Sequence, residues 1–291
     1  MALNLYPQFT AEEIDEIVRQ STDYIHGGLE KMRPPYYEKL TGTRLTLRFD
    51  NGRALYYSFS DAHTLTWSDD AGEPKEEYYD ALEADDGIIF FEHIVKGTSP
   101  QQARMIVLDT HEKLVTAFFA QIGNEVSTRE VDRDIVFGYI DDGGYHEKRH
   151  SLTTDLVGRS IVWTYSPEFA IQHIYASQWY SCFVDFNTFY GGNLLSSPCN
   201  YVKINDHVYI YSWVETEGAG VQGFVLMNLF DMHDVGCFFG INGSSKFECY
   251  TFGATGEYVG QLASLHIPND MNKDYSWPPF IDQSIDEGGE G

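Results

Sequence analysis

Two stretches decide the fold: residues 42–59 read GTRLTLRFDNGRALYYSF, and residues 158–175 read GRSIVWTYSPEFAIQHIY. They align without a gap at an offset of 116 residues (158 − 42 = 116), so that Gly42 matches Gly158. Two copies at this spacing predict two tandem supersecondary units of about a hundred residues each, which is a typical domain size.

The first of these stretches has the pattern of a β-hairpin. Its halves, LTLRF and ALYYSF, flank Asp50-Asn51-Gly52, and an Asn-Gly pair suits the positive φ angles of a tight turn. Short β-branched and aromatic runs between turn residues predict further antiparallel strands. We expect strands at 63–67, 87–95, 104–109 and 115–121 in the first unit, and at 159–165, 169–175, 179–184, 207–215, 223–229, 236–241 and 247–252 in the second.

Six to eight meandering strands per unit, with no helices between them, predict an all-β protein. The pattern fits two up-and-down antiparallel barrels or one composite of two half-barrels. A barrel of about eight strands has no sheet edges and leaves room for one small ligand. Ahead of the strands, Thr10 and Glu13 have capping-box spacing, which predicts a short helix over roughly residues 10–21.

The predicted organisation therefore has four parts: an N-terminal helical arm at 1–35, a first barrel at 36–140, a second barrel at 151–266 and an extended acidic tail at 267–291. The polar, glycine-containing segment 141–151 is expected to link the two barrels. The closing DEGGEG and the prolines before it predict a frayed end.

The charge balance argues against several classes of function. Only 19 Lys and Arg side chains face 44 Asp and Glu, for a formal charge of −25, and binding to phosphate backbones depends on clustered basic residues. We therefore expect neither nucleic acid nor membranes as partners. No signal peptide or spanning segment is evident, which predicts a cytoplasmic location and four free, buried cysteine thiols.

Alternation along three predicted strands gathers aromatic and titratable side chains on shared faces of the second unit. These residues are Trp163, Tyr165, His173, Tyr175, Tyr209, Tyr211, Trp213 and Glu215. If the faces point into the barrel, a phenol, an imidazole and a carboxylate converge in an aromatic cavity. A carboxylate desolvated there has a raised pKa and can carry protons near neutrality. The alternative is an ordinary aromatic core, with Glu215 in solvent at a strand end.

The first unit lacks these polar groups at the matching positions. Tyr57 stands where the second unit has His173, and at an offset of 120 residues Val95 stands where the second unit has Glu215. We therefore predict an apolar interior for the first unit. Because His and Glu are costly to bury without a purpose, this asymmetry is the main reason to predict a site in the second unit.

A second candidate is the segment HEKRH at 146–150, which matches the HExxH signature of zinc proteases. That signature works only on a helix that places both histidines on one face. The flanks DDGGY and SLTT break a helix, and the two variable positions are Lys and Arg. We therefore interpret the segment as a solvated linker and predict no metal and no cofactor.

These residues resemble the molybdenum cofactor biosynthesis protein F (MoaF) family. The stretches RLTLRFDNG, YYSF, LTW and MIVLDTHEKLVTAFFAQIG are similar to its N-terminal domain, and TDLVGRSIVWTYSP, QHIY and YVKINDHVYIYSWVE to its C-terminal domain. The resemblance covers about residues 36–255. It implies two tandem calycin-like (lipocalin-like) β-barrels, and a link to a biosynthetic pathway rather than a defined reaction.

A weaker resemblance is to the phenolic acid decarboxylases, which are also small calycin-like barrels. Carried over by position, Tyr165 matches one of their two carboxylate-binding tyrosines, and Glu215 matches the glutamate at the phenol end. Trp163 replaces the second tyrosine, and the arginine of that family has no counterpart in the matching stretch FYGGN at 189–193. The resemblance therefore implies related acid–base chemistry but not decarboxylation of cinnamic acids as such.

The leading functional expectation is a cofactor-independent lyase or isomerase that acts on a small aromatic or hydrophobic molecule in the second barrel. Tyr165, His173 and Glu215 are its candidate catalytic residues, with Glu215 as the proton shuttle. The candidate binding residues are Trp163, Tyr175, Tyr209, Tyr211 and Trp213. The alternatives are a non-catalytic protein that binds a hydrophobic or pterin-like ligand, and a purely structural duplicate. The sequence leaves open whether two chains pair as a homodimer.

Overall fold

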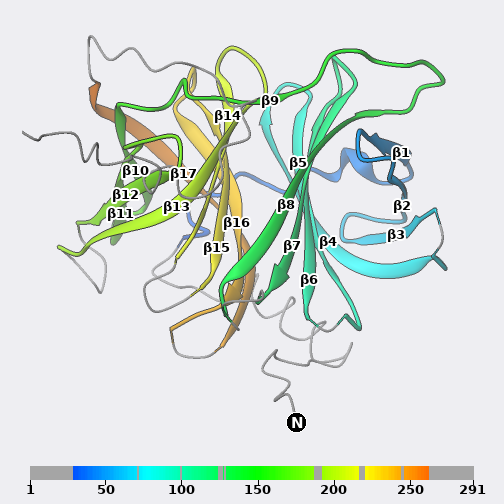
Figure 1. The fold of residues 1–291 in the computed structure, drawn as a ribbon, viewed down its shortest axis with the longest axis horizontal. Helices are drawn as coiled ribbons and strands as arrows, with labels where there is room; N and C mark the ends of the chain where they lie inside the picture. The colour runs from blue at the N-terminus through cyan, green and yellow to red at the C-terminus, as the bar shows by residue number, and fades with distance from the viewer. Residues whose placement is uncertain are drawn as a thin grey trace, which may run out of the picture.

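The computed structural model describes residues 29–261, apart from 71, 99, 124–126, 128, 187–191, 216–219 and 244–245. These residues form two closed antiparallel barrels of eight strands each, which confirms the all-β prediction (Figure 1). Their one helical element is a 3-10 turn, η1 (Glu38–Leu40), and no helix among them is long and apolar enough to cross a membrane. The predicted N-terminal helix at 10–21 and the acidic tail at 267–291 lie outside the described residues.

The first barrel is an up-and-down meander in which each strand pairs with the next. Pairing of the first strand with the last closes it, and Leu47 lies opposite Leu55 on one side and Ile140 on the other. The strands are β1 (Arg44–Phe49), β2 (Ala54–Phe59), β3 (Thr64–Asp69), β4 (Lys75–Asp85), β5 (Ile88–Val95), β6 (Gln102–Asp109), β7 (Leu114–Ile122) and β8 (Val131–Ile140).

The second barrel repeats this meander. It closes through the pairing of its first strand with its last, and the short strand β9 (Ser151–Leu152) adds to it beside Val202. Its strands are β10 (Arg159–Ser166), β11 (Phe169–Ile174), β12 (Tyr180–Asp185), β13 (Leu194–Lys203), β14 (Val208–Val214), β15 (Gln222–Asn228), β16 (His233–Ile241) and β17 (Phe247–Gln261).

The pairing register confirms the sequence repeat. Tyr57 of β2 lies opposite Leu45 of β1, and His173 of β11 lies opposite Ile161 of β10. Both pairs are related by the offset of 116 residues that the alignment gives. The hairpins are therefore structural equivalents, and a position in one barrel can be compared directly with its match in the other.

Besides the two-residue strand β9, three barrel strands escaped the sequence analysis. The segments of β4 and β8 carry several acidic residues, and β13 contains Pro198, a residue that argues against a strand because it cannot donate to the ladder. In the structure Pro198 lies opposite Tyr180 of β12, in a pairing that the closed ring of strands also requires. Closure of the second barrel thus depends on β13, a strand that its sequence does not reveal.

The two barrels share a wall, because several central strands are buried on both faces. In β5 and β14 every residue is buried: alternate side chains enter the strand's own barrel, and the others pack against the neighbouring barrel. The barrels lie side by side in Figure 1, with β15 and β16 against β4 and β5. Phe224 of the second barrel stacks on Phe90 of the first at 5.1 Å between ring centroids and meets Phe118 edge-on at 5.0 Å.

None of the four cysteines forms a disulfide, as predicted, but Cys182 is only partly buried. Cys237 and Cys249 lie in this wall. Burial holds the pKa of the Cys237 and Cys249 thiols well above their ordinary value. Beside them, burial raises the pKa of Glu92 to about 8, and the Cys249 thiol lies 3.5 Å from its Oε2 atom. The wall therefore holds these groups in their neutral forms at neutral pH.

A first prediction concerns this wall. Phe224→Ala should lower the free energy of unfolding by about 3–5 kcal/mol, because it removes a fully buried ring between two others. Urea denaturation followed by tryptophan fluorescence measures the change. Phe230, which is 80% exposed, supplies the control: Phe230→Ala should change stability by less than about 0.5 kcal/mol. Two separate unfolding transitions, with only one affected, would contradict a shared wall.

Candidate functional site

The interior of the second barrel brings most of the predicted site residues together. Each of the following is at most 3% exposed and belongs to one core cluster: Trp163, Tyr165, Tyr175, Tyr209, Tyr211 and Trp213. His173, 2% exposed, lies among them, with its ring 5.3 Å from that of Tyr211 and 5.5 Å from that of Trp213. The alternation that the sequence analysis assumed for β10, β11 and β14 therefore holds.

His173 has one partnered and one unpartnered ring nitrogen. Its Nδ1 atom lies 3.3 Å from the Tyr211 hydroxyl, which in turn lies 2.6 Å from Ser181 Oγ, whereas Nε2 has no hydrogen-bond partner. Trp213 stacks on Tyr211 at 4.8 Å. Burial lowers the pKa of His173 to about 3, so its imidazole is neutral at physiological pH. Such a ring is suited to hydrogen bonding rather than to taking up a proton.

A buried carboxylate that the sequence analysis missed lies beside Tyr165. Asp234 of β16 is 1% exposed, and burial raises its pKa to about 7. The Tyr165 side chain and the Ala254 N–H lie close enough to lower this pKa, yet neither carboxylate oxygen has a hydrogen bond of normal geometry. We predicted this strand from residue 236, which left Asp234 in a turn. Alternation back from Phe238 would have placed it inside the barrel.

Two further aromatics form a chain of polar contacts across the interior. Trp163 Nε1 donates to the Tyr175 hydroxyl at 3.1 Å, and that hydroxyl donates to Met227 Sδ at 3.1 Å. Gly256 makes room for the indole, because a Cβ atom there would lie 2.6 Å from the Trp163 ring. These rings act as fixed walls. Tyr209 differs, because its hydroxyl donates a hydrogen bond to Asp155 Oδ2 at 3.2 Å and not to any of these aromatic residues.

Glu215 directly follows β14 and is partly buried. Burial raises its pKa to about 7, with a further contribution from the carboxylates of Glu248 and Asp185. The Trp213 side chain, which also contacts His173, opposes this rise. Glu215 therefore lies at one end of the aromatic interior, two residues after Trp213. Among the described residues, no direct contact joins Glu215 to His173.

The prediction of an apolar interior for the first barrel is wrong. Tyr57 contacts His93 Nε2 through its hydroxyl at 3.1 Å, and His93 Nδ1 lies 2.5 Å from Glu77 Oε2. Glu77 also accepts the Lys96 N–H at 3.0 Å. All three side chains are buried. The acid comes from β4, a strand that the sequence analysis did not identify, so its place inside the barrel was hidden.

The HEKRH segment does not form the helix that a zinc protease needs. Residues 145–150 have no regular structure, His146 Nε2 lies 3.0 Å from Asp142 Oδ1, and His150 Nδ1 lies 2.8 Å from Thr116 Oγ1. The two histidines thus have separate partners. Within the described residues, no three His, Cys, Asp or Glu side chains form a cluster that could hold a metal ion.

Comparison with protein families agrees with the repeat. Residues 22–124 match the model described as the MoaF N-terminal domain, and residues 150–262 match the MoaF C-terminal domain. The chain belongs to the MoaF family. No curated protein matches this MoaF-family chain. Among solved structures, a candidate beta-lactamase from Burkholderia vietnamiensis is 10% identical, with a TM-score of 0.31 over 36% of this chain and 96% of that one.

The buried carboxyl of Asp234 predicts a pH dependence of stability. Its pKa rises from 3.8 in the unfolded chain to about 7 in the folded barrel, so between these values the folded state binds more protons. Unfolding free energy should then fall as pH rises from 4 to 7, by about 4 kcal/mol from this group. The Asp234→Asn variant lacks this pH-dependent contribution. The free energy of unfolding of the variant should therefore rise relative to that of the wild type as the pH increases from 4 to 7.

Urea titrations of both proteins at pH 4, 5.5 and 7.5 measure the effect. Asp206→Asn is the control, because the Asp206 side chain is fully exposed on the same barrel. Its stability difference from the wild type should stay constant with pH. A constant difference for Asp234→Asn as well would show that Asp234 is ionised inside the folded barrel.

Proposed function

We propose that this MoaF-family protein is a cofactor-independent lyase or isomerase acting on a small aromatic or hydrophobic molecule in the second barrel. The observation that carries the proposal is that the aromatic core of the second barrel buries His173 Nε2 and the Asp234 carboxylate, neither of which has a hydrogen bond of normal geometry. An unsatisfied buried polar group costs about 1–3 kcal/mol. An imidazole and a carboxylate retained in this state, beside Trp213 Nε1, which likewise lacks a hydrogen bond of normal geometry, favour a role in binding or chemistry over simple packing.

Glu215 is the proposed proton shuttle. A group transfers protons most effectively when its pKa lies near the working pH, because both of its forms are then populated. The pKa of Glu215, about 7, meets that condition. Its partial exposure at the end of the barrel also gives it a route to exchange protons with solvent.

Tyr165 and His173 are the proposed polarising groups. Burial and the nearby Asp234 carboxylate hold the pKa of Tyr165 well above its ordinary value, so its hydroxyl stays protonated. A protonated phenol and a neutral imidazole can both donate hydrogen bonds to a substrate oxygen that gains negative charge in the transition state. The proposed role of the buried Asp234 carboxylate is to keep that phenol protonated.

The surrounding rings have the chemistry to pack against a planar, largely apolar substrate. Trp163, Tyr175, Tyr211 and Trp213 are buried, and their polar tips are mostly held by one another or by Ser181 and Met227. Such walls favour stacking and apolar contact over charge recognition. Tyr209, whose hydroxyl binds Asp155, is left out of this proposed binding set.

A second candidate is a non-catalytic protein that holds a hydrophobic or pterin-like ligand. One observation favours it: His173, with a pKa of about 3, is a weak base, and Glu215 does not contact it. The same Nε2 atom and aromatic walls would bind such a ligand without turnover.

Turnover distinguishes the two candidates. Purified full-length protein is incubated with a small-molecule extract of the cells that produce it, and mass spectrometry follows compounds that are consumed and formed. The wild type should convert an aromatic compound, and Glu215→Gln should still bind that compound while converting it at least 100-fold more slowly. Glu257→Gln, an exposed change on β17 of the same barrel, should behave as the wild type.

Two results would count against the enzyme proposal. Unchanged conversion by Glu215→Gln would remove Glu215 from the mechanism. A compound that the wild type binds but never converts, and that His173→Ala releases, would establish the binding protein instead.

A further inference from the structure

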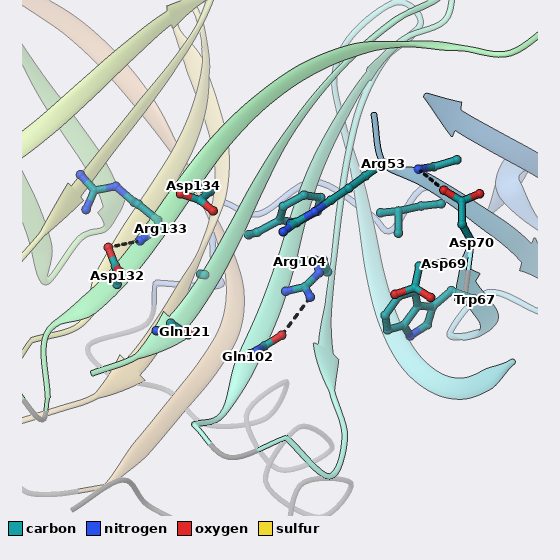
Figure 2. A pocket seen from close by; sticks show the side chains of 14 residues that line it. Arg53, Trp67, Asp69, Asp70, Gln102, Arg104, Gln121, Asp132, Arg133 and Asp134 are labelled. Atoms are coloured by element: carbon teal, nitrogen blue, oxygen red, sulfur yellow. Dashed lines mark hydrogen bonds between the residues drawn. The ribbon is translucent and has the colours of Figure 1, made fainter. Parts of the chain in front are cut away.

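A pocket of about 570 Å³ opens at one end of the first barrel, in the half of the molecule that the proposed function does not use (Figure 2). It lies where the β1–β2 turn, the end of β3, the start of β6 and the start of β8 meet. Its volume falls within the range of about 300–1,000 Å³ that is usual for small-molecule sites.

The floor of this pocket combines aromatic rings with one guanidinium group. The side chains of Trp67, Arg104 and Phe119 occupy interior positions of β3, β6 and β7, and all three line the pocket. The Arg104 guanidinium carbon lies 4.7 Å from the centroid of Phe119 and 6.0 Å from that of Trp67. The guanidinium therefore lies within cation–π distance of both rings.

Arg104 has only neutral hydrogen-bond partners. Its guanidinium donates to Gln102 Oε1 at 2.9 Å and to Ala103 O at 3.0 Å, and in the part of the chain that the structure describes it forms no ion pair. Burial lowers the pKa of Arg104, and Tyr57, Glu77 and Asp69 oppose this through space without an ion pair. Glu77 is already bound by His93. A partly buried cation without a carboxylate partner is a site for an anion.

A second, independent feature points to a ligand. Trp67 is 6% exposed, and its Nε1 atom, which has no hydrogen-bond partner, belongs to a side chain that lines the pocket. Arg53 adds another cation from the rim, with its guanidinium 5.4 Å from the Phe119 centroid (Figure 2). An indole N–H and two guanidinium groups thus surround one aromatic floor.

The acidic residues of the pocket lie at its rim rather than its floor. Asp69, Asp132 and Asp134 are exposed, and Asp70 is engaged by the Tyr56 hydroxyl and the Ala54 N–H. Rim carboxylates repel a doubly charged group more strongly than a singly charged one. The pocket is therefore better suited to a carboxylate than to a phosphate ester.

The second barrel fills the equivalent space. Arg104 lies opposite His93 on β5, and the corresponding pair in the second barrel is Gly223 opposite Trp213. A Cβ atom at Gly223 would lie 2.2 Å from the Trp213 ring, so the indole stands where the first barrel has its guanidinium. The charged floor belongs to the first barrel.

We propose that the mouth of the first barrel binds a small planar aromatic carboxylate. The carboxylate accepts hydrogen bonds from Arg104, Arg53 and Trp67 Nε1, and the aromatic ring packs on Phe119 and Trp67. A guanidinium recognises the planar fork of a carboxylate in a bidentate manner, which supplies both the affinity and the orientation.

Isothermal titration calorimetry at low ionic strength tests this with 2-naphthoate and its neutral isostere, 2-naphthamide. Wild-type protein should bind naphthoate at least tenfold more tightly than naphthamide. Arg104→Gln should weaken naphthoate binding at least tenfold and leave the naphthamide affinity within twofold. Arg53→Gln, at an exposed position that leaves the fold untouched, should weaken naphthoate binding by about three- to tenfold.

Arg44→Gln is the matched control, because Arg44 is exposed and lies at the other end of β1, so the variant loses one positive charge without touching the pocket. It should bind naphthoate within twofold of the wild type. Equal affinities for naphthoate and naphthamide, or naphthoate binding that survives Arg104→Gln, would overturn the proposal. Tighter binding of 2-naphthyl phosphate than of naphthoate would overturn the assignment to a carboxylate.

Discussion

The wall between the two barrels is the constraint on which the rest of the structure depends. Its strands have no solvent face, so each side chain must suit either the interior of its own barrel or the contact with the other barrel. Because the side-chain period of a strand is two, a slip of one residue would exchange these two sets completely. The rings of Phe90, Phe118 and Phe224 oppose that slip, and this fixes which side chains enter each barrel.

The sequence predicted the architecture more fully than the sites. The gapless repeat and the Asn-Gly turn at 51–52 revealed two all-β units, because each pattern is visible within a short continuous stretch of sequence. The barrel strands that were missed, β4, β8 and β13, take their place only when the barrel closes, which is a non-local event. Their interior residues were missed with them, and for this reason the sequence predicted an apolar first barrel although Glu77 lies inside it.

Within the second barrel, alternation placed the aromatic residues and His173 correctly, because these strands are regular and their periodicity is visible. Asp234 was missed because the strand begins earlier than its apolar run suggests. The pocket of the first barrel could not be predicted from sequence. Its floor joins Trp67, Arg104 and Phe119 from three strands, and only the closed barrel brings them together.

The comparison of the two barrels also changes what the duplication means. Each barrel buries one histidine against an aromatic ring at the same pair of positions, but on opposite strands: Tyr57 with His93 in the first, His173 with Trp213 in the second. In the first, Glu77 satisfies the histidine; in the second, its Nε2 atom has no partner. The two barrels therefore carry the buried histidine on different strands and give it different partners.

The shared wall makes this duplication hard to reverse. The apolar outer face of each barrel is covered by the other barrel. Neither half can now be lost without exposing the surface that Phe90 and Phe224 cover. A cut in the exposed connection at 142–145 would therefore leave two fragments with complementary apolar faces.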